Sequence, residues 1–168
     1  RIAVCPGATI RAVHFPTLVW YNAAVRREAI AQIRAMGDEP VTLVGFSKSG
    51  LGAWNIARVI PDRVAATVIF DAPMVRLQKP PWGTDPFYAD DAAWQMDVPA
   101  LTIPEFRAAV PAAHRLVLIS GANFHDEMVA MAGALTAQGV SPVFLPRPDL
   151  RHHWNSGWLE EGLRRAAR

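Results

Sequence analysis

A serine lies among small residues in "GFSKSG", residues 45–50, at the end of an apolar run. A sharp turn from strand into helix at this point would push the Oγ of Ser47 out of the sheet. The start of the helix would supply backbone N–H groups and the positive end of its dipole for a developing oxyanion. The stretch is therefore typical of a serine nucleophile, and an N-cap of the following helix is the alternative for Ser47.

A serine nucleophile needs a general base, and histidine is the most common one. Of the five histidines, only His152 and His153 follow a late apolar run. They lie in "RPDLRHHWNSGW", ahead of a C-terminal helical pattern. This loop is a candidate source of the base, and the alternative is an exposed polar loop packed by its two tryptophans.

Residues 45–49 resemble the G-x-S-x-G motif of the α/β-hydrolase family, with Ser49 in place of the final glycine. Residues 152–158 are similar to an H-x-W-x-S-G-W string that relatives carry before their last helix. The second resemblance implies that His152, rather than His153, is the base. The motifs come in the family's order and extend over nearly the whole chain.

The family's chain order is serine, acid, histidine, and its acid usually follows the strand before the last. Here that position is in "GANFHDEM", where Asp126 is the best match and Glu127 is the alternative. Asp71 in "VIFDAP" is the second candidate, because some relatives place the acid one strand earlier. A carboxylate in the first turn of a helix would also explain Asp126. The resemblance therefore implies a triad of Ser47, Asp126 and His152.

The family's oxyanion hole combines the N–H after the nucleophile with an N–H from the loop after the first strand. The expected donors are Lys48 and Ala8, with Thr9 as the alternative to Ala8. The family often has His-Gly where this chain has Pro6-Gly7. The short stretch between this loop and the serine fits either a minimal member of the family or a fragment of a longer one.

The resemblance implies a serine hydrolase, and we expect it to cleave carboxylic esters through an acyl-enzyme, without a cofactor. A small-molecule ester is the expected partner. The same triad serves thioesterases, peptidases and acyltransferases, and a catalytically inert binding protein with this fold is the non-enzyme alternative. Some of five aromatic residues would line an apolar pocket or pack in the core: Trp82, Phe87, Tyr88, Trp94 and Trp154.

Short apolar runs alternate with stretches of helical period, which predicts an α/β fold. The expected strands are 2–5, 41–46, 64–70, 115–120 and 140–145, and the expected helices lie near 25–36, 49–60, 126–138 and 156–167. Apolar residues at consecutive positions are typical of strands buried on both faces. We therefore expect a minimal α/β-hydrolase fold, with a mostly parallel sheet of about five or six strands flanked by helices.

The chain is expected to form a single domain over residues 1–168. Its 168 residues are 51% hydrophobic and 19% charged, with a mean hydropathy of +0.12, as in packed globular proteins. The irregular stretch 71–111, rich in proline and tryptophan, is expected to be a lid or a pocket wall.

The remaining composition excludes several classes of protein. The net charge of +2 and the absence of interleaved arginines and aromatics argue against nucleic-acid binding.

No apolar run is long enough to span a membrane, and no signal peptide is visible, although one could precede Arg1. Cys5 is the only cysteine, so an internal disulfide and a cysteine metal cluster are excluded. A soluble protein, with the cytoplasm favoured, is expected, and its oligomeric state is left open.

Overall fold

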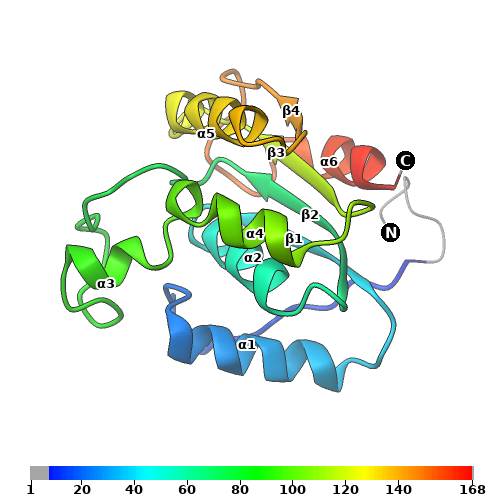
Figure 1. The fold of residues 1–168 in the computed structure, drawn as a ribbon, viewed down its shortest axis with the longest axis horizontal. Helices are drawn as coiled ribbons and strands as arrows, with labels where there is room; N and C mark the ends of the chain where they lie inside the picture. The colour runs from blue at the N-terminus through cyan, green and yellow to red at the C-terminus, as the bar shows by residue number, and fades with distance from the viewer. Residues whose placement is uncertain (1–7, 168) are drawn as a thin grey trace.

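The computed structural model describes residues 8–167, which form a sheet of four parallel strands in the order β1-β2-β3-β4 (Figure 1). The strands are β1 (Val41–Phe46), β2 (Val64–Phe70), β3 (Arg115–Ile119) and β4 (Val143–Leu145). The expected α/β architecture with a parallel sheet is confirmed. The described part has four strands rather than five or six, and the expected strand 2–5 lies outside the described residues.

The bounds of β1 and β2 are those that the apolar runs predict, whereas β4 is shorter than the run 140–145. Pro142 precedes the first residue of β4. Proline has no N–H to donate to a ladder, which explains why the pairing of β4 begins only at Val143.

Four helices correspond to the predicted helical stretches: α1 (Ala23–Ala35), α2 (Lys48–Val59), α5 (His125–Ala137) and α6 (Trp158–Ala166). At the start of α1, the side chain of Asn22 accepts a hydrogen bond from the N–H of Val25 at 3.0 Å. Gly37, with φ of 120°, follows the end of α1. Both ends of α1 therefore reflect a local signal in the sequence.

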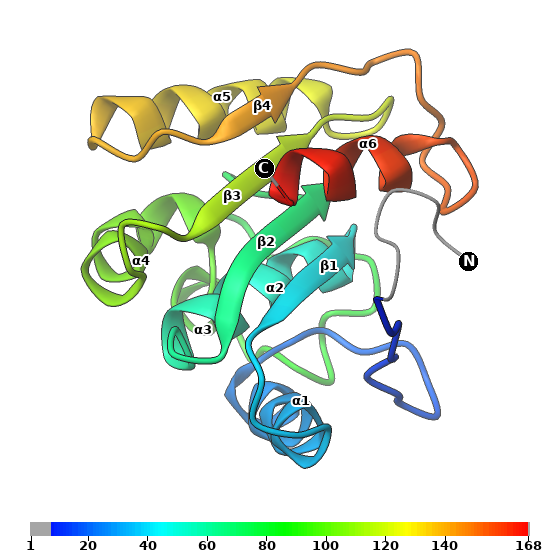
Figure 2. The ribbon, with the colours of Figure 1, turned by 90° about the vertical axis from the view of Figure 1, so that its right-hand side faces the viewer.

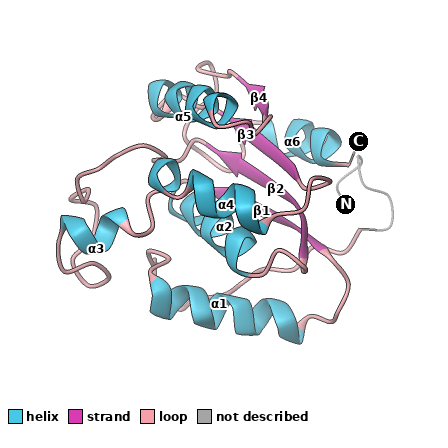
Figure 3. Ribbon diagram, in the orientation of Figure 1, coloured by secondary structure: helices cyan, strands magenta, loops and turns pink. Residues whose placement is uncertain are grey.

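The helices cover both faces of the sheet (Figures 2 and 3). Helix α6 packs on β2 and β3 from the side opposite α2, where Trp158 lies against Phe70 and Ile119. Alternate residues of the same strands, such as Ile69 and Leu118, face the larger core cluster beneath α2 and α5. The alternation buries both sides of each central strand, as the consecutive apolar positions predict.

Residues 71–111 contain three short helices: α3 (Asp91–Gln95), η1 (Pro99–Leu101) and α4 (Ile103–Ala109). Phe106 of α4 stacks on Trp54 of α2 at a centroid distance of 3.9 Å, so the second half of this stretch belongs to the core. Helix α3 lies at the end of long loops, away from the strands (Figure 1). The expected role of the stretch as a lid or pocket wall stays a prediction.

Within residues 8–167, every helix is too short or too polar to cross a lipid bilayer.

His114, which precedes β3, has both ring nitrogens bonded beside β2. Its Nδ1 lies 3.1 Å from the carbonyl oxygen of Val64, and its Nε2 lies 3.1 Å from Oγ1 of Thr67. A carbonyl only accepts, so Nδ1 carries the hydrogen and Nε2 accepts from the threonine. Burial lowers the pKa of His114, and the bond to Val64 opposes this effect.

This lowered pKa predicts a pH-dependent stability. Between the folded-state pKa and the ordinary value of about 6.5, the unfolded chain binds more protons than the folded protein. The free energy of unfolding should therefore rise with pH through this window, by at most about 1.4 kcal/mol per pH unit. Urea titrations at several pH values should show a smaller slope for His114→Gln than for the wild type. The exposed His14 provides the control, and an unchanged slope in His114→Gln would contradict the prediction.

Candidate active site

Ser47 joins β1 to α2 in a strained backbone conformation, with φ of 55° and ψ of −122°. It occupies the N-cap position of α2, yet its side chain makes no capping hydrogen bond. Its N–H donates to the carbonyl of Phe70 at 3.0 Å, which fixes the turn to the neighbouring strand. Capping of α2 therefore does not explain a serine at this position.

The turn around Ser47 leaves no room for larger residues on either side. A Cβ on Gly45 would lie 2.2 Å from the carbonyl oxygen of Ser49, and one on Gly50 would lie 2.8 Å from the Cβ of Ala72. The Oγ of Ser49 bonds both the N–H and the C=O of Phe46, each at 2.9 Å. The residue that departs from the G-x-S-x-G pattern thus ties the turn back to its strand.

Asp71 occupies the same place after β2 that Ser47 occupies after β1. Phe46 and Phe70 are partners in the parallel register, so the residues that follow them leave the sheet side by side. Neighbouring strands lie about 4.8 Å apart. Asp71 also has a positive φ, of 42°, and these are the two non-glycine residues of the described chain with this property.

The carboxylate of Asp71 is fully buried and is held by backbone groups. Its Oδ1 accepts from the N–H groups of Gly121 at 3.0 Å and Phe124 at 2.8 Å, and its Oδ2 accepts from Asn123 at 3.2 Å. A Cβ on Gly121 would lie 2.5 Å from the Cγ of Asp71. The turn after β3 therefore wraps closely around the carboxylate, and its N–H groups satisfy the buried charge.

His152 meets this carboxylate from the loop between β4 and α6. Its Nδ1 lies 2.7 Å from Oδ2 of Asp71, and its side chain is 24% exposed. An ionised carboxylate only accepts, so Nδ1 donates and Nε2 of the neutral ring keeps its lone pair. The ring packs on Phe46 at a centroid distance of 4.4 Å and on Phe124 at 5.6 Å. Within the described residues, no hydrogen bond joins Ser47 to His152.

The structure does not bring the expected acid, Asp126, to His152. Asp126 is exposed in the first turn of α5, and within residues 8–167 it makes no hydrogen bond or ion pair. Its alternative, Glu127, pairs with Arg76 at 2.5 Å. The N–H groups that precede α5 wrap around Asp71, so α5 begins beyond the carboxylate. Asp71, the second candidate from the sequence, holds the place expected for Asp126.

The other expected residues lie as follows. His153 is exposed, and its Nδ1 accepts from the N–H of Asn155 at 3.1 Å. The N–H of Lys48, the first residue of α2, makes no hydrogen bond to the described part of the chain. Ala8 is exposed and precedes α1, and no hydrogen bond of the described residues places it beside Ser47. The two expected oxyanion donors stay predictions.

Aromatic side chains surround His152. Phe46 contacts Trp154 at a centroid distance of 5.3 Å, and Phe124 contacts Trp82 at 5.7 Å. Trp154 and Trp82 are 47% and 42% exposed, which is high for tryptophan. Of the five aromatics expected at a pocket, these two flank the site, whereas Tyr88 and Trp94 are buried with Trp20 and Leu51. Phe46 and Phe124 were not expected, although Phe46 immediately precedes the serine.

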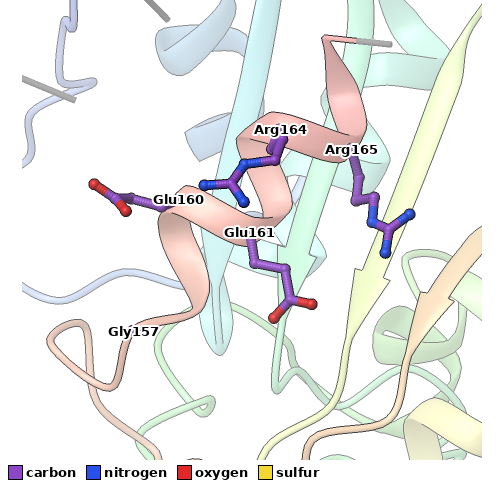
Figure 4. A pocket seen from close by; sticks show the side chains of 5 residues that line it. All are labelled: Gly157, Glu160, Glu161, Arg164 and Arg165. Carbon is purple, nitrogen blue, oxygen red and sulfur yellow. The ribbon is translucent and has the colours of Figure 1, made fainter. Parts of the chain in front are cut away.

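Two hollows of the described surface lie away from these residues. One, of about 350 Å³, is lined by Gly157, Glu160, Glu161, Arg164 and Arg165 on and before α6 (Figure 4). The other, of about 720 Å³, lies between α1 and the stretch around α3. Neither is lined by Ser47, Asp71 or His152. Within residues 8–167, no three His, Cys, Asp or Glu side chains are grouped closely enough to hold a metal ion.

Comparisons with known proteins identify the family and the fold of the chain. The model of the Esterase family matches residues 28–128, which include Ser47 and Asp71. A solved structure of a ferulic acid esterase has a similar fold, with a TM-score of 0.50 and 20% sequence identity over 73% of this chain and 48% of that chain. The chain thus spans about half the length of that protein. No curated protein matches the sequence.

Proposed function

The chain belongs to the Esterase family of α/β-hydrolase proteins, and on this premise we propose that it cleaves carboxylic esters with a triad of Ser47, His152 and Asp71. The contact of 2.7 Å between Nδ1 of His152 and Oδ2 of Asp71 carries the proposal. It orients the histidine, whose ring packs on Phe46, the residue before the strained serine turn, and this supports an acyl-transfer site.

In the proposed reaction, Oγ of Ser47 attacks the acyl carbon while its proton passes to Nε2 of His152. The histidine returns this proton to the departing alkoxide, and an acyl-enzyme remains. Water then attacks the acyl-enzyme, giving its proton to His152, and the proton returns to Oγ as the carboxylic acid leaves. Asp71 stays ionised and stabilises the imidazolium in both halves of the cycle.

The oxyanion of each tetrahedral intermediate needs hydrogen-bond donors. We propose that the N–H of Lys48 is one of them, because it lies at the start of α2 directly after the serine. The N–H of Ala8 is the proposed second donor, on the family resemblance alone. Removing one such donor typically costs about 10²- to 10³-fold in kcat.

The aromatic surroundings support a small ester with an apolar or aromatic group. Trp82 and Trp154 are partly exposed, and Phe124 and Phe46, respectively, connect them to the histidine. Such rings bind flat apolar groups by stacking and by burial of area. The substrate after which the structural neighbour is named, a ferulic acid ester, is of this kind.

A fluorophosphonate probe tests the nucleophile directly. We expect one phosphonyl group per folded molecule, located on the peptide that carries Ser47 by mass spectrometry, together with hydrolysis of p-nitrophenyl acetate. Protein unfolded in urea is the control and should not react, because the histidine is then no longer positioned. An adduct on another serine, or an unlabelled folded protein, would refute the proposed mechanism.

A further inference from the structure

The side chain of Lys48 reaches from the start of α2 to an exposed turn on the other side of the site. Its Nζ lies 2.8 Å from the carbonyl oxygen of Trp82 and 4.8 Å from the centroid of the Trp20 ring. The indole N–H of Trp20 donates to the same carbonyl at 3.2 Å. The Trp82 carbonyl thus accepts two hydrogen bonds, one of them from a cation.

The ammonium group of Lys48 contacts this carbonyl and the face of the Trp20 ring, and it contacts no carboxylate of the described residues. Within the described residues it forms no ion pair. Burial lowers the pKa of Lys48, since part of its hydration is lost. The contact with Trp20 offsets this loss by a cation–π interaction. The lysine is therefore packed in place and is not a freely solvated surface residue.

The turn at residues 81–83 is closed by Oγ1 of Thr84, which donates to the carbonyl of Pro80, and the bonds to the Trp82 carbonyl add to this closure. Pro81, Trp82 and Gly83 are exposed, and within residues 8–167 their hydrogen bonds are the two to the Trp82 carbonyl. The flanking parts are held separately, because Lys79 bonds Asp85 and the carbonyl of Tyr88. The bonds to its carbonyl therefore help to fix the position of Trp82, together with the contacts of its ring.

The Trp82 ring lies at the margin of the site. One side meets Phe124, whose ring contacts His152, and the guanidinium of Arg76 lies 4.9 Å from its centroid. A substrate group bound beside His152 on this side would meet the exposed face of Trp82. Lys48, which directly follows the proposed nucleophile, thus also holds Trp82 at the margin of the site through the Trp82 carbonyl.

We infer that the side chain of Lys48 is a positioning residue that fixes Trp82 as a substrate-binding wall and so favours esters with a bulky aryl group over small esters. The inference rests on the proposed function for its substrate class. The hydrogen bond from Nζ of Lys48 to the Trp82 carbonyl, called the tether below, is a property of the fold and can be tested without measuring activity.

Hydrogen–deuterium exchange tests the tether. Lys48→Met keeps the length and the apolar packing of the side chain but removes the donor, whereas Lys48→Arg keeps a cation that can reach the carbonyl. We expect the indole N–H of Trp20, which is buried and donates to the same Trp82 carbonyl, to exchange about tenfold faster by NMR in Lys48→Met than in the wild type, and Lys48→Arg to restore slow exchange. Equal exchange of this indole proton in all three proteins would overturn the inference.

Kinetics test the consequence for selectivity, with vinyl acetate, vinyl cinnamate and 1-naphthyl acetate as substrates. Lys48→Met should raise KM about tenfold relative to vinyl acetate for vinyl cinnamate, for 1-naphthyl acetate or for both. The ratio of kcat values should change less. Trp82→Ala should produce the same shift, and the double variant should add nothing further. Unchanged KM ratios, or additive effects, would overturn the selectivity. A folded wild type that hydrolyses none of the three esters would instead refute the proposed function, and the exchange experiment would still decide the tether.

Discussion

His152→Ala is expected to lower kcat/KM for p-nitrophenyl acetate by about 10⁴- to 10⁶-fold. The variant keeps Ser47 but leaves no group to accept its proton, so attack would proceed from an unactivated hydroxyl. The imidazole is 24% exposed and packs on Phe46 by one face, so its removal should leave the fold largely intact. Circular dichroism would check the fold, and steady-state kinetics would measure the loss.

The adjacent histidine is the matched control. His153 is exposed, and its ring accepts one hydrogen bond, from the N–H of Asn155 in its own loop. His153→Ala should therefore change kcat/KM by about threefold or less, as expected for a surface change. Loss of activity in His153→Ala together with near wild-type turnover in His152→Ala would exchange the two roles.

Asp71→Asn is expected to lower kcat by about 10⁴-fold while the protein still folds. Asparagine tolerates the positive φ of this position. Its amide oxygen would take the place of Oδ1, which accepts from two backbone N–H groups. Its NH₂ would then face Nδ1 of His152 and would lose the bond of 3.2 Å that Oδ2 accepts from the N–H of Asn123. The ring would have to accept at Nδ1 and carry its hydrogen on Nε2, which cannot then receive the proton of Ser47.

Asp126→Asn provides the comparison for this second result. Asp126 is exposed and makes no contact with the histidine in the described structure, so its variant should keep kcat within about threefold of the wild type. Kinetics of the two variants at the same pH would separate the candidates. A large loss in Asp126→Asn with an active Asp71→Asn would restore the acid that the family resemblance implies.

Most of the fold could be predicted from the sequence because its signals are local. The bounds of β1 and β2 follow from uninterrupted apolar runs, and Gly37 and Gly139 lie just after the ends of α1 and α5. The serine turn was also recognisable, since small residues at 45 and 50 are a steric requirement of its geometry.

The partner of His152 was harder to predict because it depends on the strand register. Nothing local states that Phe46 pairs with Phe70, which places Asp71 beside Ser47. One signal was present, since Asp71 follows an apolar run directly, as Ser47 does. Gly121, whose lack of a side chain leaves room for this carboxylate, lies fifty residues further along the chain. The need for glycine there can be seen only in the folded chain.

At Ser47 and Asp71 the backbone has a positive φ, which residues other than glycine rarely adopt. Each costs about 1 to 3 kcal/mol that glycine would largely avoid. Selection for stability alone would therefore favour glycine at position 47, where the side chain makes no capping hydrogen bond. At position 71 glycine would leave the N–H groups of Gly121, Asn123 and Phe124 without their acceptor. The same trade-off predicts that Ser47→Gly will be at least as stable as the wild type and inactive.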